Sequence, residues 1–365
     1  MLIGIPREIK KDEYRVAMLP VGVELLKKDG CSILFQKGAG LGSGYADDAY
    51  AAAGAELVDS ADEIYAQAEM VVKVKEPQPE EIARFRPGLL VFCYFHFAGS
   101  RDLTEACLKK QIAAVAYETL ADRQGHLPLL TPMSEIAGKM SIQEGAKCLE
   151  KPMMGRGILL GGVPGVAPAN VLIIGGGIVG ASAARVAAGL GANVVLMDIS
   201  LDRLRYLDSI MPPNVTTVFC DPYTIRQCVA PADLVVGAAL VPGGKTPVLI
   251  DRQTLRTMKK GAVLVDVSID QGGCFATSRP TTHSDPVFIE EGVVHYCVTN
   301  MPGAVGRTST KALCNATLPY CRELAQAGLD VFVKRTTGRA AALNMREGKL
   351  LHPAVARAFP DLVHG

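Results

Sequence analysis

The sequence predicts an α/β protein built from doubly wound parallel sheets, with two domains and a cleft between them. Short apolar runs alternate with helical segments along most of the chain, and strands that alternate with helices form parallel sheets. One of these runs leads through a glycine-rich turn into a helix of small residues. The chain of 365 residues exceeds one typical domain, so we expect two domains that each bury a core.

The composition is that of an ordinary soluble protein and argues against several other classes. The formal net charge is +1, so no charge excess points to nucleic acid or a membrane surface. Charges appear by the seventh residue, and the apolar runs are too short to span a bilayer, so we expect neither a signal peptide nor a membrane segment. The ten cysteines contain no C-x-x-C pair and the six histidines show no metal spacing. We therefore expect reduced thiols, a cytoplasmic protein and no metal.

The most informative stretch lies between residues 169 and 200. Its apolar run Val171–Ile174 predicts a strand that is buried on both faces. Gly175, Gly177 and Gly180 then form G-x-G-x-x-G. The first glycine permits a tight turn, the second lets a pyrophosphate approach the backbone, and the third lets the helix pack on the strand. The amides at the start of that helix would face the phosphates.

The acid at the end of the next strand indicates which dinucleotide binds. Residues 194–197 predict that strand, and Asp198 ends it where a carboxylate can bind both ribose hydroxyls. Asp198 would repel a 2′-phosphate, which favours NAD over NADP. Arg203 and Arg205 weaken this inference, because a nearby arginine can receive the phosphate; the alternative is a solvated helix face. The segment therefore predicts a Rossmann-type site for NAD.

The residues before this segment, 1 to about 125, predict a complete α/β unit of their own. The glycines of 38–44 have the wrong spacing for the dinucleotide fingerprint, so we expect a flexible surface loop there and not a second phosphate loop. The predicted strands are 2–5, 32–36, 70–74, 89–97 and 113–116, and the predicted helices are 20–29, 47–54, 60–68, 79–84 and 102–110.

The remaining elements complete the nucleotide fold and return to the first unit. Apolar residues at helical spacing over 133–150 predict a helix that joins the units. A long helix over 308–326 contains Pro319, which predicts a kink or a boundary. The tail 344–362 has too little apolar material for its own core, so we expect it to fold back with that helix. Further strands are predicted at 215–220, 234–237 and 262–267, and further helices at 224–229 and 251–258.

This organisation predicts two Rossmann-like domains. We assign residues 1–130 and 305–365 to a discontinuous substrate and catalytic domain. Residues 131–304 are assigned to the NAD-binding domain.

Four polar residues stand at or beyond the ends of predicted strands or loops, where open α/β sheets bind ligands. Lys75 ends the run 71–75 and can hold a carboxylate or polarise a carbonyl; the alternative is an exposed charge paired with Glu76. His96 lies near the end of the aromatic run 91–97. It suits either proton transfer near neutral pH or a hydrogen-bonded place in the core.

The other two residues are Arg15 and Asp270. Arg15 follows a charged loop, and its planar fork can grip a carboxylate, although most arginines in such loops are solvated. Asp270 lies just beyond the strand 262–267. It either interacts with an amino group or water near the nicotinamide, or it caps the loop.

The motifs that contain these residues resemble NAD-dependent alanine dehydrogenase, in the alanine dehydrogenase and nicotinamide nucleotide transhydrogenase family. The resemblance covers nearly the whole chain in order. It is carried by GIPREIKKDEYRVAMLP, VKVKEP, YFHF, MSEIAGKMSIQEGA, GGVPGV, GGGIVG, VDVSIDQGG and VTNMPGAVGRTST. It implies reversible oxidative deamination of L-alanine to pyruvate and ammonium with NAD, and a homo-oligomer, typically a hexamer.

The resemblance also implies roles for single residues. Arg15 and Lys75 match the substrate-binding pair, His96 the acid/base and Asp270 the second catalytic residue, and Met133 and Asn300 match further pocket residues. Cofactor contacts of the family fall at Ser134, Gly175, Gly177, Ile178, Val179, Gly180, Asp198, Arg203, Cys220, Ala239, Leu240, Val267, Ser268, Ile269, Arg279, Val298, Thr299 and Met301.

Two positions depart from the family, and two alternative functions remain. Cys220 stands where the family often has serine, so the resemblance does not carry the hydroxyl contact with the cofactor over to this chain. Some members hold a divalent ion near the position of Glu323, but no histidine lies beside it here, so we predict no metal. The alternatives are a non-catalytic NAD(H)-binding subunit of a transhydrogenase-like assembly, and a dehydrogenase of another amino or opine acid. The presence of Lys75, His96 and Asp270 together favours the enzyme.

Overall fold

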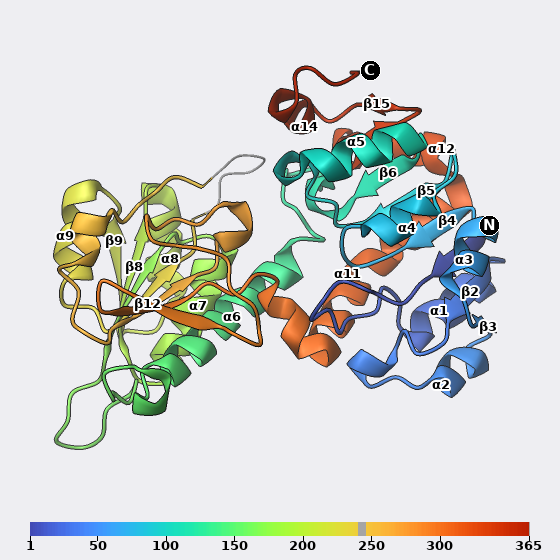
Figure 1. Ribbon diagram of the computed structural model, residues 1–365. Coiled ribbons are helices and arrows are strands. Elements are labelled where there is room, and N and C mark those ends of the chain that lie inside the picture. The colour runs from blue at the N-terminus through green and yellow to red at the C-terminus, as the bar shows by residue number, and fades with distance from the viewer. Residues whose placement is uncertain (240–245, 365) are drawn as a thin grey trace. The chain divides into compact units, whose positions relative to one another are not determined.

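The computed structural model describes residues 1–239 and 246–364 (Figure 1). The chain forms two compact units. Unit 1 consists of Met1–Met133 and Gly303–Gly365, and unit 2 consists of Ser134–Pro302. The C-terminal part of the chain therefore folds with the N-terminal part. Among the described residues, no helix is both long and apolar enough to cross a membrane.

Unit 1 is built on a sheet of eight strands, ordered β15-β14-β6-β5-β4-β1-β2-β3. The six strands from the N-terminal part are parallel, whereas β14 and β15 add to one edge in antiparallel pairing. The strands are β1 (Leu2–Ile5), β2 (Ser32–Gln36), β3 (Glu56–Val58), β4 (Met70–Val72), β5 (Leu90–Cys93), β6 (Ala113–Ala116), β14 (Leu343–Arg346) and β15 (Lys349–Leu350).

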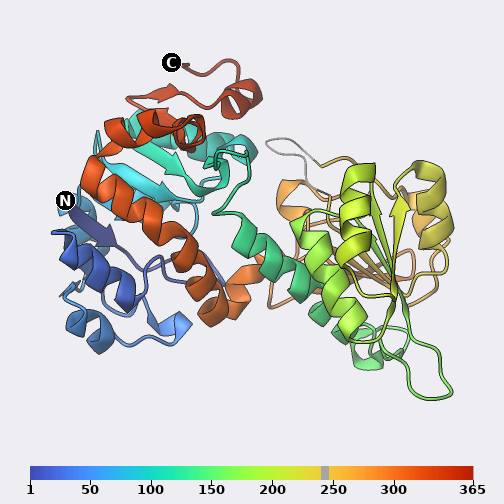
Figure 2. The same ribbon diagram turned by 180° about the vertical axis from the view of Figure 1, so that it is seen from behind.

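Helices cover both faces of this sheet, as the two opposite views show (Figures 1 and 2). A core on one face joins β4, β5 and β6 to α3, α4 and α5, and it includes Tyr65, Val91 and Cys107. On the other face α1 packs against α11. The helices are α1 (Pro20–Lys28), α2 (Asp47–Ala52), α3 (Ala61–Gln67), α4 (Pro79–Ala83), α5 (Arg101–Lys110), α11 (Gly306–Ala327), α12 (Leu329–Arg335), α13 (Thr337–Ala342) and α14 (Pro353–Ala358).

Local sequence explains where several of these elements begin and approach one another. Ser60 and Glu63 form a capping box at the start of α3, in which each side chain accepts a hydrogen bond from a backbone amide. Gly4 lets α3 approach β1, because a Cβ there would lie 2.3 Å from Ile64 Cγ2. The strands β5 and β6 are buried at every residue, as expected for interior strands of a parallel sheet.

The structure corrects the predicted ends of two strands. β4 ends at Val72 and not at 74, so Lys75 lies in the loop after the strand. β5 ends at Cys93 and not at 97, and His96 adopts a left-handed backbone with φ of 54°, which an extended strand does not permit. Both residues still follow the carboxyl ends of their strands.

Two other local features differ from what was expected. Pro319 lies inside the continuous helix α11, so it does not mark a boundary of that helix. Pro319 and Asn315, whose carbonyl loses its helical donor, are both exposed, so water can satisfy that carbonyl. The glycine-rich loop 38–44 is not a loose surface loop. Ser43 is fully buried there, and its hydroxyl bonds the Tyr14 carbonyl at 2.8 Å.

Unit 2 contains a sheet of seven strands, ordered β12-β13-β11-β10-β7-β8-β9. All are parallel except β12, which pairs antiparallel with β13. The strands are β7 (Asn170–Ile174), β8 (Asn193–Asp198), β9 (Val215–Phe219), β10 (Leu234–Gly237), β11 (Val263–Asp266), β12 (Val287–Glu290) and β13 (Val293–Tyr296). The helices are α6 (Thr131–Cys148), α7 (Ile178–Gly189), α8 (Leu201–Ile210), α9 (Pro222–Val229) and α10 (Arg252–Leu255).

The helix α6 begins in unit 1, and most of its length belongs to unit 2. It packs closely on α7, because a Cβ at Gly138 would lie 2.2 Å from the Val179 carbonyl oxygen. A larger residue at 138 would therefore force the two helices apart.

The six parallel strands follow the same spatial order in both units. That order is β3-β2-β1-β4-β5-β6 in unit 1 and β9-β8-β7-β10-β11-β13 in unit 2. The direction of winding reverses between β1 and β4 and between β7 and β10. In such sheets ligands bind beyond the carboxyl ends of the strands at the reversal. The predicted α/β fold of two doubly wound sheets is confirmed, with antiparallel strands added at one edge of each.

Candidate active site

Three loops of unit 1 leave the carboxyl edge of its sheet close to the reversal point. They follow β1, β4 and β5, which are neighbours in the sheet in the order β1-β4-β5. Arg15 lies on the first loop, Lys75 on the second and His96 on the third. The topology thus places a guanidinium, an ammonium and an imidazole on adjoining loops of one edge.

Arg15 is buried and held by an acid two residues before it. Its Nε donates to Glu13 Oε1 at 2.6 Å, and its Nη2 donates to the other carboxylate oxygen. The side chains are 2% and 0% exposed, so this is a buried, bidentate ion pair. Burial lowers the pKa of Arg15, but Glu13 more than offsets this effect and the pKa is raised. The solvated-loop alternative for Arg15 is therefore wrong.

Lys75 is also buried, and it faces the acid that follows it. Its Nζ lies 3.6 Å from Glu76 Oε2, and Lys10 pairs with the other oxygen of the same carboxylate. Burial raises the pKa of Glu76, but Lys75, Lys10 and His96 together hold it below its usual value. The charged form of the Glu76 carboxylate is therefore favoured mainly by Lys75 and Lys10, with a smaller effect from His96.

His96 is exposed, and not buried among aromatic residues as its sequence context suggested. Its ring is nearly parallel to that of Tyr94, with centroids 5.8 Å apart. Its backbone amide donates to Glu118 Oε1 at 2.6 Å, and Phe95 N donates to both oxygens of that carboxylate. Glu118 therefore holds the left-handed turn that carries His96, and the imidazole remains accessible for proton transfer.

Met133 and Tyr94 complete this group of side chains. Arg15 Nη1 lies 3.1 Å from Met133 Sδ, a weak acceptor. Burial raises the pKa of Tyr94, and Arg15 opposes the shift. The Tyr94 hydroxyl donates to the Leu129 carbonyl at 2.5 Å. The predicted residue Met133 thus lies directly against the predicted residue Arg15.

Sequence reasoning missed the two acids Glu13 and Glu118. The only local signal for Glu13 is its spacing, because residues two apart in a loop can contact each other. No local signal points to Glu118, which is 22 residues from His96 and meets it only because β5 and β6 are neighbours.

The glycine turn of unit 2 has the predicted geometry. Gly175 has φ of 108°, and a Cβ there would lie 2.6 Å from the Ala238 carbonyl oxygen. A Cβ at Gly177 would meet nothing within 4 Å, so the backbone is open to an approaching group. A Cβ at Gly180 would lie 1.8 Å from the Gly175 carbonyl oxygen. The turn, its open face and the N-terminus of α7 fit a pyrophosphate.

Gly180→Ala is expected to weaken NADH binding about tenfold or more, because the added methyl group would push α7 away from the turn. Gly189→Ala is the matched control, since a Cβ at that position of the same helix meets nothing within 4 Å. Titration of NADH fluorescence measures both. Equal affinities in the two variants would contradict the close-packing role.

Asp198 ends β8 beside the glycine turn. Its Oδ2 accepts from Gly176 N and its Oδ1 from Ser200 N, both at 2.8 Å. Arg203 Nε donates to the Gly176 carbonyl at 2.7 Å. Arg203 is therefore not just part of a solvated helix face, because it bonds the backbone of the glycine turn. Cys220 N donates to the Asp198 carbonyl at 3.0 Å, so the predicted residues 198, 203 and 220 gather around the turn.

Asp270 lies on a loop held by a buried acid. The loop leaves β11 at Asp266, whose side chain accepts from Ser268 N at 3.0 Å and Cys274 N at 2.9 Å. Burial raises the pKa of Asp266, and hydrogen bonds to it oppose the shift. Ser268 Oγ donates to the Ala239 carbonyl at 2.6 Å, which ties this loop to the one after β10. Asp270 itself is exposed.

The remaining predicted cofactor residues also belong to unit 2, except that Leu240 lies outside the described residues. Asn300, which was predicted as a substrate-pocket residue, also lies in unit 2; it has a left-handed backbone with φ of 57° and is buried. Arg279 stacks over the Phe288 ring at 4.0 Å. Of the others, Val298, Met301 and Ile269 are buried, Ser134, Val179, Val267 and Thr299 are half-buried, and Ile178 is exposed.

Glu323 lies at the position near which some members of the family hold a divalent ion. Here its carboxylate pairs with arginines. Its Oε1 accepts from Arg335 Nη1 at 2.8 Å, and its Oε2 accepts from Arg339 Nη2 at 2.8 Å. Within the described ranges, no group of three or more His, Cys, Asp or Glu side chains could hold a metal ion.

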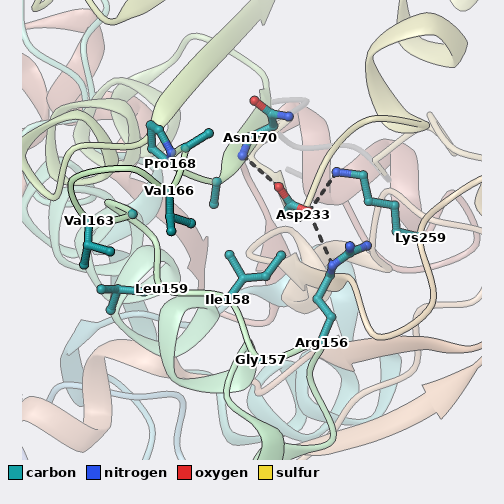
Figure 3. Close-up of a pocket in the computed structure, with 13 residues that line it drawn as sticks. Arg156, Gly157, Ile158, Leu159, Val163, Val166, Pro168, Asn170, Asp233 and Lys259 are labelled. Atoms are coloured by element: carbon teal, nitrogen blue, oxygen red, sulfur yellow. Dashed lines mark hydrogen bonds and ion pairs between the residues drawn. The ribbon is translucent and has the colours of Figure 1, made fainter.

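A pocket of unit 2 lies at the amino ends of its strands, whereas the predicted site residues of this unit follow the carboxyl ends (Figure 3). It surrounds Asp233, which precedes β10 and accepts from Asn170 N at 2.9 Å and from Lys259 Nζ at 2.8 Å. Arg156 Nε approaches the same carboxylate at 3.5 Å. None of the predicted site residues lines this pocket. Asp233 holds both cations of the pocket, Lys259 and Arg156, and its bond to Asn170 N joins them to the start of β7, which fits an architectural role at the amino ends of the strands.

Comparison with known proteins agrees with this arrangement. The N-terminal domain model of alanine dehydrogenase/PNT matches residues 4–137, and the C-terminal domain model matches residues 141–353. Alanine dehydrogenase from Halomonas elongata is 50% identical and covers 98% of this chain and 97% of its own length. The Bacillus subtilis enzyme is 49% identical, with coverage of 98% and 94%.

Two solved structures extend the comparison. An L-alanine dehydrogenase superposes with a TM-score of 0.95 at 47% identity, over 100% of both chains. A transhydrogenase from Sinorhizobium meliloti superposes with a TM-score of 0.80 at 23% identity, over 97% of this chain and 100% of its own, and so shares the fold. The chain therefore belongs to the alanine dehydrogenase/PNT family.

Proposed function

We propose that this chain is an alanine dehydrogenase that catalyses the reversible oxidative deamination of L-alanine to pyruvate and ammonium with NAD. The observation that carries the proposal is the set of three loops at one edge of unit 1, which presents Arg15, Lys75 and His96. A carboxylate-binding pair and an accessible acid/base are the groups that an α-amino acid or 2-oxo acid requires. Membership of the family supports the same substrate.

Unit 1 serves as the substrate and catalytic domain in this proposal, with predicted bounds 1–130 and 305–365. The domain 131–304 binds NAD through the turn Gly175–Gly180, the ribose-binding Asp198 and the loops after β10, β11 and β13. When bound, NAD supplies the acceptor for the hydride that leaves Cα of alanine. The open backbone at Gly177 and the start of α7 support this placement of the pyrophosphate.

The chain's own residues perform binding and proton transfer. Arg15 and Lys75 hold the carboxylate and carbonyl oxygen, which orients Cα for reaction. His96 moves protons to and from the water and the hydroxyl of the carbinolamine that collapses to pyruvate and ammonium. Asp270 orients the amine or the water and stabilises developing positive charge. Met133 and Asn300 are proposed as further pocket residues.

NADH formation by the purified chain tests the proposal directly. L-alanine with NAD is expected to give turnover, whereas D-alanine, L-serine and NADP are expected to give little. Tight NADH binding without any turnover would instead support a non-catalytic NAD(H)-binding subunit. Faster turnover with another amino acid would show that this amino acid, and not alanine, is the preferred substrate.

Asp198→Ser tests the preference for NAD. Loss of a carboxylate that bonds both ribose hydroxyls is expected to weaken NAD binding roughly 10–100-fold and to narrow the gap to NADP. Asp202→Ser is the matched control, since Asp202 is an exposed acid on the neighbouring helix that pairs with Arg205. An unchanged preference in Asp198→Ser would remove this residue from the role.

We further propose a cytoplasmic homo-oligomer, a hexamer by family resemblance. The ten free cysteines support a reducing compartment. Light scattering of the purified chain would measure the assembly, and a monomer at micromolar concentration would contradict it.

A further inference from the structure

The chain just beyond β4 is left without a sheet neighbour on one side. On the β5 side, Lys73 N donates to the Phe92 carbonyl at 3.1 Å, and the Val74 carbonyl accepts from Tyr94 N at 3.0 Å. On the other side lies β1, which ends at Ile5. The sheet therefore supplies no acceptor for backbone amides that point toward β1 after Val72.

The side chain of Glu8 supplies this acceptor. Its Oε1 accepts from Val74 N at 2.7 Å, and its Oε2 accepts weakly from Lys75 N at 3.4 Å. The carboxylate is 3% exposed, so these bonds form away from water. A carboxylate from the loop after β1 thus takes the place of the missing strand.

A fully buried lysine keeps the Glu8 carboxylate in position. Lys73 Nζ donates to Glu8 Oε2 at 3.0 Å and lies 2.6 Å from Glu81 Oε1. Burial raises the pKa of Glu8, and Lys73 opposes that shift. Glu81 also accepts from Tyr65 Oη at 2.9 Å and from Gln78 N at 2.8 Å. Glu81 therefore anchors α3 and α4, whereas Glu8 contacts the backbone of 74 and 75.

We propose that Glu8 is a positioning residue for Lys75: it holds the backbone of 73–75 so that the Lys75 ammonium is presented to the substrate. The inference rests on the proposed function, in which Lys75 binds the substrate. Glu8 is 66 residues from Val74 in sequence, and it contacts this segment through Val74 N, Lys75 N and Lys73 Nζ.

Glu8→Gln and Glu81→Gln form a matched pair for the test. Each replaces one of two buried carboxylates around Lys73, and each leaves one carboxylate to balance its charge. In Glu8→Gln the side-chain NH2 group must point either toward Lys73 Nζ and Lys75 N or toward Val74 N. All three are donors, so the turn must shift. Glu81→Gln leaves the bonds to Val74 and Lys75 in place.

Pyruvate affinity is measured by calorimetry on full-length enzyme loaded with NAD+, which cannot reduce pyruvate. We expect about tenfold weaker binding in Glu8→Gln, the equivalent of one or two hydrogen bonds, and less than about a twofold change in Glu81→Gln. Glu8→Asp keeps the charge but shortens the reach to the amides, so it should weaken binding similarly. It also provides a folded test if the glutamine variant does not fold.

A double-mutant cycle distinguishes positioning from general destabilisation. If Glu8 acts through Lys75, adding Glu8→Gln to Lys75→Ala causes no further loss of pyruvate affinity. Equal losses in the two backgrounds, or equal losses in Glu8→Gln and Glu81→Gln, would overturn the inference. If Lys75→Ala alone leaves pyruvate affinity unchanged, the proposed role of Lys75 fails instead.

Discussion

Replacement of His96 by asparagine is expected to lower turnover about 10²–10⁴-fold, the usual cost of losing a general acid/base. Asparagine tolerates the left-handed backbone at this position, with φ of 54°, and does not titrate near neutral pH. Glu118 bonds backbone amides of the turn, so the loop should keep its shape. Steady-state kinetics with L-alanine and NAD measure the effect.

NADH binding should be unchanged in His96→Asn, because the glycine turn and Asp198 belong to the other unit. His126→Asn is the matched control, since His126 is an exposed histidine of the same unit that pairs with Asp122 at 2.9 Å. It should retain full activity. Full activity in His96→Asn as well would remove His96 from catalysis.

Replacement of Arg15 by methionine is expected to have two effects. It should weaken substrate binding, and it should lower the free energy of unfolding by about 3–5 kcal/mol. It removes the guanidinium that balances the charge of the Glu13 carboxylate, which is 0% exposed and keeps the hydrogen bond from the backbone amide of residue 15. For a unit of this size the loss corresponds to a fall in Tm of roughly 6–20 °C. Thermal unfolding and pyruvate titration measure the two effects separately.

A second substitution separates stability from binding. Glu13→Leu combined with Arg15→Met removes both buried charges and should recover much of the lost Tm while pyruvate binding stays weak. Arg322→Met is the control for a less buried ion pair, because the Arg322 side chain keeps 38% of its surface exposed where it bonds Asp29, and it should cost at most about 1 kcal/mol. Recovery of pyruvate affinity in the double variant would show that Arg15 is only structural.

Features that depend on short-range patterns could be predicted from the sequence. The turn at Gly175, Gly177 and Gly180 could be predicted because backbone conformation and close approach at each glycine follow from the missing Cβ. Most strands and helices of both units could be predicted because burial imposes apolar runs and helical spacing on neighbouring residues. The positions of Arg15 and Asp270 after strands could be predicted for the same reason, whereas Lys75 and His96 were expected within the last residues of their strands and lie beyond them.

The groups that surround these residues depend on how distant parts of the chain fold together. The spacing of apolar residues does not show which strands will be neighbours in a sheet. The antiparallel pairing of β14 with β6 could therefore not be predicted from residues 344–362. The exposure of His96 depends on a left-handed turn held by Glu118, and the shape of the loop with Lys75 depends on Glu8. Glu118 and Glu8 lie 22 and 66 residues from the backbone amides that donate hydrogen bonds to them. Buried charges find partners across the fold because desolvation makes an unpaired charge costly, and that constraint acts on spatial and not on sequence neighbours.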